Sequence, residues 1–363
     1  MAKRLVFQTN KQDYSVSRTV ECEEPDLSNG QVRVKLDRFA FTANNITYAV
    51  LGERMHYWAF FPVNEIDQQN WGVIPVWGYA DVIESKEQNL PVGDRLFGYF
   101  PPASTLVMTP SNVSPDRFIE ASEHRKTLPI GYNLYQRVLA DNGYEQSQDN
   151  ERMVFTPLFV TAYCLHNMLS TKDWYGAQQI VIISASSKTS VGLGYALVGD
   201  VRAPKTIGLT SRRNLDALQS FGVYDEVTSY EAIEELDSSK ATVIVDMSGN
   251  AEVLARLHRH LGQNMCFTSN VGITHWRNLA PVSGIIADRS QMFFVPAHIQ
   301  SLIESLGIVE YQKQTSEFIE TISKKIRPWM KFKEVAGLSG LQDVYGDVCG
   351  GKVEPNISLS IKL

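Results

Sequence analysis

The stretch "QQIVIISASSKTSVGLGYAL" (residues 178–197) begins as an apolar run typical of a buried strand and ends as a helical pattern. Between the two lies Ser-Ser-Lys-Thr-Ser, at a position where a nucleotide-binding turn usually carries glycines. Small residues are required there because backbone N–H groups at the start of the helix must approach a pyrophosphate closely. Small polar side chains meet this requirement, so the stretch predicts a strand, a phosphate-binding turn and a helix.

Two other interpretations of this turn stay open. One is a serine-rich loop that only caps an ordinary helix. The other is the phosphate loop of nucleotide hydrolases, which ends in a Lys-Thr pair like that of Lys188 and Thr189. That loop has a glycine directly before the lysine, whereas residue 187 is serine, so the hydrolase interpretation is disfavoured.

The sequence around this stretch predicts an α/β protein with two domains, since 363 residues exceed the usual size of one hydrophobic core. From about residue 156, apolar runs alternate with helical segments, which is typical of a doubly wound parallel sheet. The first third instead contains short β-rich pieces separated by turn residues, as in a barrel or sandwich. We expect a β-rich domain with a partly helical connection over 1–155, a cofactor-binding domain over 156–300, and a segment over 301–363 that returns to the first domain. The strands expected in the second domain are "QIVIIS", "TIGLTS", "TVIVDMS", "NMCFTSN" and "MFFVPA".

The end of the strand "TIGLTS" gives independent evidence. Folds that prefer NAD usually carry an acidic residue there for the ribose 2′-hydroxyl, but this chain has Ser211, Arg212 and Arg213. Two guanidiniums and a hydroxyl suit a 2′-phosphate, because arginine forms charge-assisted bidentate bonds with it. These residues therefore favour NADP(H) over NAD(H). The alternative is a solvated basic start of a helix, although cations there oppose the helix dipole.

Composition excludes several classes of function. The formal net charge of −6, without a long basic run or a Cys/His finger spacing, argues against nucleic acid. The four cysteines are far apart in the sequence and form no CxxC pair, which favours reduced thiols and a cytoplasmic location over disulfides or structural zinc. We identify no export signal and no uninterrupted apolar segment of membrane-spanning length, so no membrane association is expected.

With these residues in view, the chain resembles the medium-chain dehydrogenase/reductase superfamily, on the side of its zinc-free quinone and ene reductases. The resemblance runs nearly end to end, through "SNGQVRVKLDRFAFTANNITYAVLG", "VGDRLFGYF", "TAYCLHNML", "GLTSRRNLDALQSFGVYDEVTSY" and "GGKVEPNISLSIKL". The combination of "NNITYAV", "PVWGYAD", "SASSKT" and "VGITHW" further resembles a subgroup described only as a domain of unknown function. The resemblance implies a Rossmann domain together with a GroES-like β-rich domain.

The resemblance also implies roles for individual residues. It places the pyrophosphate near the serine-rich turn, the 2′-phosphate near the end of the second strand, and the nicotinamide after "NMCFT". Tyr48 matches a pocket tyrosine of quinone reductases, and Asn44 lies one position away from a family asparagine. The cofactor residues implied are Ser187, Lys188, Thr189, Gly192, Ser211, Arg212, Arg213, Tyr230, Ser269 and Asn270.

The chain departs from the zinc-dependent members of the superfamily. They carry Gly-His-Glu where this chain has "VWGYAD", and "FAFTANN" lacks their ligand cysteine, so no catalytic metal is predicted. The substrate must then be polarised by hydroxyl or amide hydrogen bonds. Tyr48 is the candidate proton donor or oxyanion stabiliser, and an ordinary buried tyrosine is its alternative. Aromatic side chains favour an apolar or aromatic substrate, and the candidate pocket residues are Trp58, Trp77, Tyr79, Tyr99 and His275.

Three functions agree with the sequence. The first is an NADPH-dependent, zinc-independent reductase of a quinone, enone or related conjugated carbonyl. The second is a noncatalytic NADPH-binding sensor or assembly protein, and the third is a dehydrogenase in a biosynthetic pathway. The expected partner is a small molecule, and a homodimer is expected by analogy with members of the superfamily.

Overall fold

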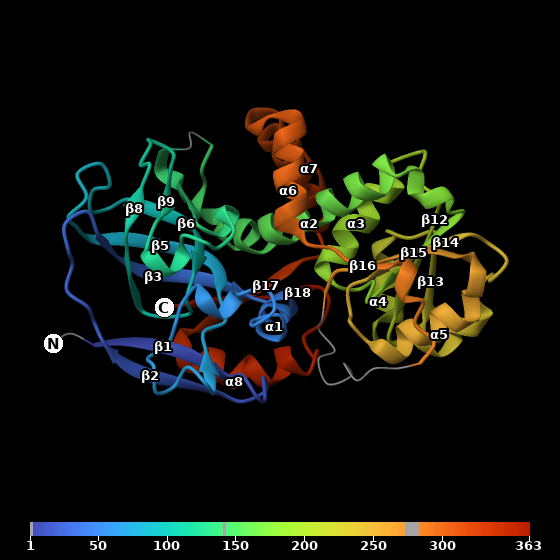
Figure 1. The fold of residues 1–363 in the computed structure, drawn as a ribbon, viewed down its shortest axis with the longest axis horizontal. Coiled ribbons are helices and arrows are strands. Elements are labelled where there is room, and N and C mark those ends of the chain that lie inside the picture. The colour runs from blue at the N-terminus through green and yellow to red at the C-terminus, as the bar shows by residue number, and fades with distance from the viewer. Residues whose placement is uncertain (1–2, 141–142, 273–282) are drawn as a thin grey trace. The chain divides into compact units, whose positions relative to one another are not determined.

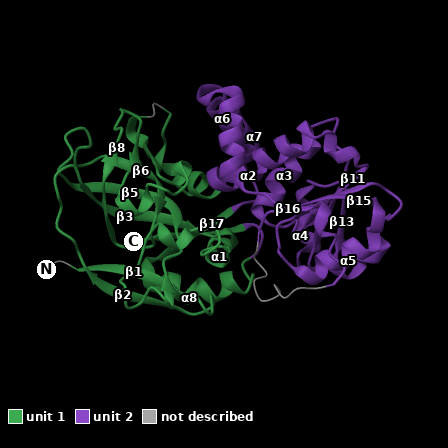
Figure 2. Cartoon of the chain, in the orientation of Figure 1, with its two compact units in different colours: residues 1–154, 331–353, 357–363 green, residues 155–330, 354–356 purple. Residues whose placement is uncertain are grey.

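A computed structural model describes residues 3–140, 143–272 and 283–363 (Figure 1). The chain divides into two compact units, coloured separately in Figure 2. Unit 1 contains residues 1–154, 331–353 and 357–363, and unit 2 contains residues 155–330 and 354–356. Each unit has its own sheet, so each is described by itself.

Unit 2 is built on a parallel sheet of six strands in the order β13-β12-β11-β14-β15-β16. The direction of winding reverses at β11, whose neighbours are β12 and β14, and ligands of open α/β sheets bind outside the strand ends at such a point. The predicted doubly wound sheet is therefore confirmed. Its strands are β11 (Gln179–Ile183), β12 (Lys205–Thr210), β13 (Glu226–Ser229), β14 (Thr242–Asp246), β15 (Met265–Asn270) and β16 (Ser290–Met292).

The helices of unit 2 follow from local sequence signals, as α5 shows. Asn250 caps its first turn, because the side-chain oxygen accepts from the amides of Glu252 and Val253, and Gly262 with φ +53° ends it. The helices are α2 (Asp149–Thr171), which begins in unit 1, and α3 (Lys188–Val198), α4 (Leu215–Phe221), α5 (Ala251–Leu261), α6 (Val295–Leu306) and α7 (Ile308–Ile326).

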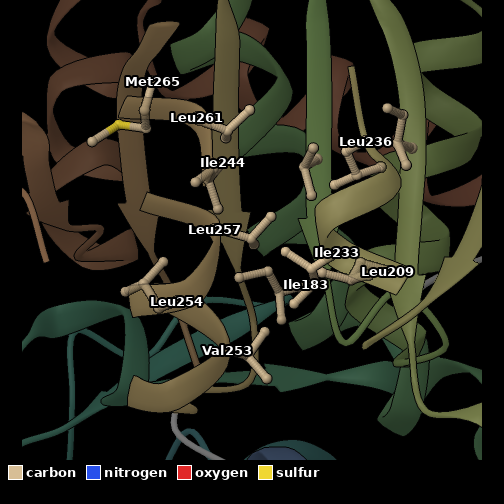
Figure 3. Close-up of a cluster of buried hydrophobic side chains, with 12 residues drawn as sticks. Ile183, Leu209, Ile233, Leu236, Ile244, Val253, Leu254, Leu257, Leu261 and Met265 are labelled. Carbon is tan, nitrogen blue, oxygen red and sulfur yellow. The ribbon is translucent and has the colours of Figure 1, made fainter. Parts of the chain in front are cut away.

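The apolar face of α5 covers one side of the sheet. Figure 3 shows Leu254, Leu257 and Leu261 of this helix beside Ile183 and Ile244 of the central strands. All five side chains are at most 5% exposed, and burying one such side chain stabilises the fold by about 1.5–3 kcal/mol. This packing fixes the sheet that carries the candidate cofactor residues.

Two predictions about the C-terminal half need correction. The strand expected at "MFFVPA" (residues 292–297) lies earlier in the chain, at Ser290–Met292, so the two share only Met292. α6 begins at Val295, because Pro296 suits the first turn of a helix. The segment 301–363 does not return to the first unit as a whole. Residues up to Met330 belong to unit 2, because Leu302 and Tyr311 of α6 and α7 pack against α2, and the return begins at Lys331.

Unit 1 is β-rich. A nine-stranded sheet contains the path β17-β18-β3-β5-β6-β10-β9-β8, with β7 paired to β3, and a smaller sheet has the order β2-β1-β4. Its helices are α1 (Ala43–Val50) and α8 (Gly337–Cys349). Its strands are β1 (Lys3–Asn10), β2 (Ser17–Glu23), β3 (Val32–Phe41), β4 (Trp71–Gly72), β5 (Val76–Ser85), β6 (Arg95–Phe100), β7 (Thr105–Met108), β8 (Pro110–Ser111), β9 (Arg117–Glu120), β10 (Leu134–Arg137), β17 (Lys331–Ala336) and β18 (Ile357–Lys362).

A buried ion network fastens the first turn of α2 to β6. The guanidinium of Arg95 donates to Asp37 Oδ2 at 2.7 Å, to Asp149 Oδ2 at 2.7 Å and to Asp81 Oδ1 at 3.0 Å. The Arg95 side chain is 8% exposed and that of Asp149 is fully buried. Because Asp149 begins α2, its carboxylate also interacts favourably with the helix dipole.

Among the described residues, the segment Gln146–Thr171 is long and apolar enough to span a membrane by length and composition. Half of its most apolar window is buried inside the structure. A buried core helix meets the same two criteria.

The Arg95 network predicts a strong effect on stability. Arg95→Met leaves the buried Asp149 carboxylate without its cation, and we expect the free energy of unfolding to fall by about 3–5 kcal/mol. Arg202→Met is the matched control, since Arg202 is 70% exposed in its pair with Asp200 and such pairs contribute at most about 1 kcal/mol. Urea denaturation of both variants measures the difference, and equal losses would contradict this account of the network.

Candidate functional site

The serine-rich turn joins β11 to α3. Ser184 follows the strand in the left-handed conformation, with φ +58°, a region that glycine occupies more readily than serine. Ser187 caps α3, because its hydroxyl accepts from the Ser190 amide. The sequence therefore forms the predicted strand, turn and helix.

The hydroxyls of the turn bond within the protein. Ser186 Oγ lies 3.1 Å from Thr210 Oγ1, and Ser187 Oγ lies 2.8 Å from Ser190 Oγ. Ser190 Oγ also donates to the Ser184 carbonyl. These bonds fix the shape of the turn, so the first-turn amides of α3 are its best groups for an anion.

Tyr224 supports the turn from the protein interior, a role that sequence reasoning missed. Its hydroxyl lies 2.9 Å from the carbonyl oxygens of both Ala185 and Ser190. Its ring packs against Gly194 and Gly208, where an added Cβ would approach ring atoms to 3.0 and 2.6 Å. Gly194 and Gly208 are the features of the sequence that could have indicated a large side chain behind this turn.

Gly192 packs against a helix. An added Cβ would lie 2.8 Å from the ring of Phe159 and 3.4 Å from Ala162, both on α2. Gly192 thus allows α3 and α2 to approach closely.

Lys188 and Thr189 are the first residues of α3, and both are half-buried. Desolvation lowers the pKa of the Lys188 ammonium to about 8. A cation at the N-terminus of a helix opposes the helix dipole. An anion bound at this turn would relieve both effects.

The end of β12 presents exposed positive charge. Arg212 and Arg213 are exposed in a short 3₁₀ turn, and Ser211 before them makes no capping bond. Glu231, at the end of the next strand, has a lowered pKa through hydrogen bonds from Ser229 and its own backbone, and then through the charges of Arg212 and Arg256. An acidic residue therefore lies near the predicted 2′-phosphate site.

Tyr230 and Asp246 lie on either side of the Ser184 turn, at the ends of β13 and β14. Burial raises the pKa of Tyr230, and the Asp246 carboxylate raises it further. The Tyr230 hydroxyl interacts with Ser184. Burial also raises the pKa of Asp246 to about 6, against hydrogen bonds from Ser248 and Gly249. A carboxyl with this pKa is about half ionised near pH 6, so its negative charge falls progressively as the pH drops through that value.

Ser269 and Asn270 are the last two residues of β15. Ser269 is 1% exposed, and its hydroxyl has no hydrogen-bond partner among the described residues. Asn270 is half-buried. A buried hydroxyl without a partner at this edge of the sheet fits a site that is completed by a ligand.

In unit 1, α1 carries Asn44 and Tyr48 on one face, four residues apart. A capping box between Thr42 and Asn45 begins this helix, and Asn45 Nδ2 donates to the Pro75 carbonyl at 2.9 Å. The Asn45 side chain is thus engaged in hydrogen bonds that hold α1 in place. Asn44 is half-buried and interacts with the Tyr48 hydroxyl.

Tyr48 belongs to a cluster of aromatic rings, which we call the tyrosine cluster. Trp77 Nε1 donates to the Tyr48 hydroxyl at 3.3 Å, and the Tyr48 and Tyr99 rings meet edge to face at 5.6 Å. Burial raises the pKa of Tyr48 and that of Tyr99, so both hydroxyls stay protonated at neutral pH. Sequence reasoning missed Tyr57 and Tyr132, because these two residues lie in short 3₁₀ turns far apart in the chain. The tyrosine cluster consists of Tyr48, Tyr57, Phe60, Trp77, Tyr99 and Tyr132.

A buried arginine lies behind the tyrosine cluster. Arg125 is 2% exposed, and its guanidinium lies 5.2 Å from the Phe60 ring. It donates to Asn133 Oδ1, to the Tyr135 hydroxyl and to the Tyr132 carbonyl. Within the described part of the chain, no carboxylate forms an ion pair with it. Its positive charge lowers the pKa of Tyr99, against the larger effect of burial.

Two other predicted pocket residues, Trp58 and Tyr79, lie apart from this cluster. The Trp58 indole sits between Gly52 and Gly72, where added Cβ atoms would approach it to 2.0 and 2.4 Å. Tyr79 packs on Phe97, with ring centroids 5.1 Å apart. The structure thus brings Asn44, Tyr48, Trp77 and Tyr99 together, but not Trp58 or Tyr79. His275 lies outside the described residues.

Across residues 3–140, 143–272 and 283–363, no three His, Cys, Asp or Glu side chains are grouped so that they could hold a metal ion.

Solved structures with the same fold cover nearly the whole chain. CurA from Vibrio vulnificus in complex with NADPH has a TM-score of 0.63 at 11% identity, and 99% of each chain is covered. A mutant enoyl thioester reductase from Candida tropicalis has a TM-score of 0.54 at 14% identity, covering 100% of both chains. The yhdH oxidoreductase from Salmonella enterica in complex with NADP has a TM-score of 0.53 at 13% identity, covering 99% of each. At these identities the likeness establishes the fold, which confirms the predicted Rossmann and GroES-like pair.

Curated proteins give no match to this chain. A family model, described as protein of unknown function (DUF2855), matches residues 39–354. This match covers most of both units, and it agrees with the subgroup that the motifs of the sequence resemble. The chain therefore belongs to the DUF2855 family.

Proposed function

We propose that the chain is an NADPH-dependent oxidoreductase that transfers a hydride to a conjugated carbonyl such as a quinone or an enone. Unit 2 holds the cofactor, and the tyrosine cluster of unit 1 binds the acceptor. One observation carries the proposal: the predicted cofactor residues converge at the carboxyl edge of a doubly wound sheet, at its switch point. The NADPH complex of CurA, a full-length match in fold, supports the choice of cofactor.

The residues at that edge fit NADPH. Ser184 and Ala185 are small residues just before α3, the start of a helix suits a pyrophosphate, and Lys188 adds a positive charge. Arg212 and Arg213 suit the 2′-phosphate, because exposed guanidiniums can bind it in a bidentate way. The Ser269 hydroxyl, which has no hydrogen-bond partner in the part of the chain that the structure describes, gives the nicotinamide carboxamide a hydrogen-bonding group.

Bound NADPH supplies the hydride, and the protein orients the acceptor and provides a proton. Tyr48 is suited to give that proton, because burial keeps it protonated and Trp77 occupies one of its oxygen lone pairs. We propose that the reaction uses no zinc ion, since Gly78, Tyr79 and Ala80 replace the Gly-His-Glu of the zinc-dependent relatives.

A noncatalytic NADPH-binding protein is the second candidate. The observation that favours it is the burial of Tyr48, whose side chain is only 6% exposed. The two functions share a cofactor and differ in turnover, so a cofactor titration tests both and an acceptor assay separates them.

The arginines at the end of β12 predict cofactor selectivity. Replacing both Arg212 and Arg213 by alanine should weaken NADPH binding by about 1.5–3 kcal/mol for each charged hydrogen bond lost, and should spare NADH. Fluorescence titration of wild type and variant with both cofactors measures this difference.

Glu231→Gln is the complementary control, since it removes the acidic group near Arg212 without removing a cation. We expect it to tighten NADPH binding and to leave NADH binding unchanged. Equal affinities of the wild-type protein for NADPH and NADH would refute the assignment of a 2′-phosphate site.

We predict that removing the Tyr48 hydroxyl lowers turnover without weakening cofactor binding. Tyr48→Phe should slow NADPH oxidation with an enone or quinone by about 100-fold or more, because a positioned proton donor contributes that much. Its affinity for NADPH should not change. Tyr345→Phe is the control, since this buried hydroxyl binds Thr9 and the Tyr14 carbonyl outside the tyrosine cluster. Slow oxidation that is equal in wild type and Tyr48→Phe would favour the noncatalytic binder.

A further inference from the structure

A buried histidine joins α5 to the residues that lead into β16. His258 lies in the last turn of α5 and is 1% exposed. The Ile286 amide nitrogen lies 2.9 Å from His258 Nδ1, and Thr268 Oγ1 lies 2.9 Å from His258 Nε2. Both ring nitrogens are therefore bonded inside unit 2. We call these three residues, His258, Thr268 and Ile286, the histidine bridge.

The donors and acceptors of the histidine bridge fix the ring in one neutral tautomer. A backbone N–H can only donate, so Nδ1 accepts from Ile286 and the ring proton lies on Nε2. The Nε2–H then donates to Thr268 Oγ1. The Thr268 hydroxyl agrees with this direction, because it donates in turn to Met265 Sδ at 3.4 Å. A doubly protonated ring would place two donors against each other at Ile286.

The surroundings of the ring oppose a positive charge on it. Burial, and then the guanidinium of Arg289, lower the pKa of His258 to about 4. Arg289 is held near the end of α5, because it donates to the carbonyl oxygens of Gln263 and Met265. The geometry and the charge therefore favour the same neutral form of the ring.

The other basic side chains in this turn of α5 bond elsewhere. Arg259 donates to the Ser283 carbonyl, and His260 Nε2 bonds to the Leu236 carbonyl. β15 faces the ring with the hydroxyl of Thr268, which does not titrate near neutral pH. Among the described residues, Arg289 is therefore the charged group that acts on the ring.

The histidine bridge lies beside a short strand pair at the edge of the sheet. β16 has three residues and is the last strand in the order, paired with β15. Ser269 and Asn270 of β15 pair with its last two residues. Ile286 lies four residues before β16, and its carbonyl accepts from the Ser290 hydroxyl at 2.7 Å. The bridge thus connects α5 both to β15 and to the residues that lead into β16.

We propose that neutral His258 is a positioning residue that holds the β15–β16 edge against α5, and that protonation of its ring releases the residues leading into β16. In the released form the ring is solvated and titrates near its ordinary pKa of about 6.5. The released form therefore takes up protons that the closed form refuses. The closed edge is most stable above pH 6.5 and loses stability as the pH falls toward 4.

Hydrogen exchange measured by mass spectrometry tests this pH dependence. In wild type, the protection of residues 283–292, corrected for intrinsic exchange rates, should fall by about 10-fold or more between pH 7 and pH 5 relative to β11. The amide of His258→Gln accepts and donates but does not titrate, so its protection should change by less than about 2-fold. His260→Gln, on the same helix, is the matched control and should keep the wild-type pH dependence.

Nitrogen NMR of wild-type protein with labelled histidines gives a second measurement, which does not depend on the folding of a variant. The ring whose Nδ1 shows a hydrogen-bond coupling to the Ile286 amide should be the Nε2–H tautomer and should stay neutral well below pH 6.5. A buried histidine that only fills space would show neither this coupling nor a link between its titration and residues 283–292.

Two results would overturn the proposal. One is an Nδ1–H tautomer for His258, since that ring could not accept from Ile286. The other is an equal pH dependence of exchange at residues 283–292 in wild type and His258→Gln. Neither measurement involves a cofactor.

One consequence rests on the proposed function. Because Ser269 and Asn270 lie in the same strand pair, NADPH should bind wild type more weakly at pH 5 than at pH 7, and His258→Gln should reduce this difference. Lys188 and Asp246 also titrate, but they do so in both proteins. A protein that binds no NADPH at any pH would remove the proposed function, whereas the exchange and NMR results would still decide the role of His258.

Discussion

The close approach of α3 to the end of β11 is the constraint on which the candidate cofactor site depends. A glycine-rich turn achieves this approach by having no side chains, whereas this chain achieves it with serines whose hydroxyls bond inward. Tyr224 completes the arrangement by bonding to two carbonyl oxygens of the turn. The result is a turn with a fixed shape, whose backbone amides remain the groups best placed to bind an anion.

Charged residues surround the serine-rich turn at the same edge of the sheet. Along the strand order β13-β12-β11-β14, the strands are followed or ended by Glu231, Arg212, Lys188 and Asp246, so two cations lie between two acidic residues at this edge. Burial lowers the pKa of Lys188 and raises that of Asp246, so each shift favours the neutral form of a buried group. A phosphate bound there would favour the charged form of the lysine and the neutral form of the aspartic acid.

The parts that could be predicted from the sequence are those governed by local patterns. Apolar runs such as "QIVIIS" and "TVIVDMS" predicted the parallel sheet, since a buried strand is apolar on both faces. Ser211, Arg212 and Arg213 could be assigned to the end of a strand for the same reason. The tyrosine cluster could not be predicted in full, because Tyr57 and Tyr132 lie in loops that meet only in the folded unit. Trp58 was grouped with the cluster by its aromatic character, but the glycines on both sides of its indole show that it fills the fold.

The tyrosine cluster differs from an ordinary aromatic core in the number of hydroxyls that it buries. A core needs only the rings, and phenylalanine would fill the same volume without a polar atom to satisfy. The hydroxyls of Tyr57 and Tyr132 form a hydrogen bond with each other at 3.2 Å, and Trp77 Nε1 donates to the Tyr48 hydroxyl. Tyr99 hydrogen-bonds in turn with Tyr48, and the positive charge of Arg125 lowers its pKa against the larger effect of burial. The buried hydroxyls of the cluster are therefore linked to one another as well as packed, and these bonds hold the neutral Tyr48 hydroxyl in one place.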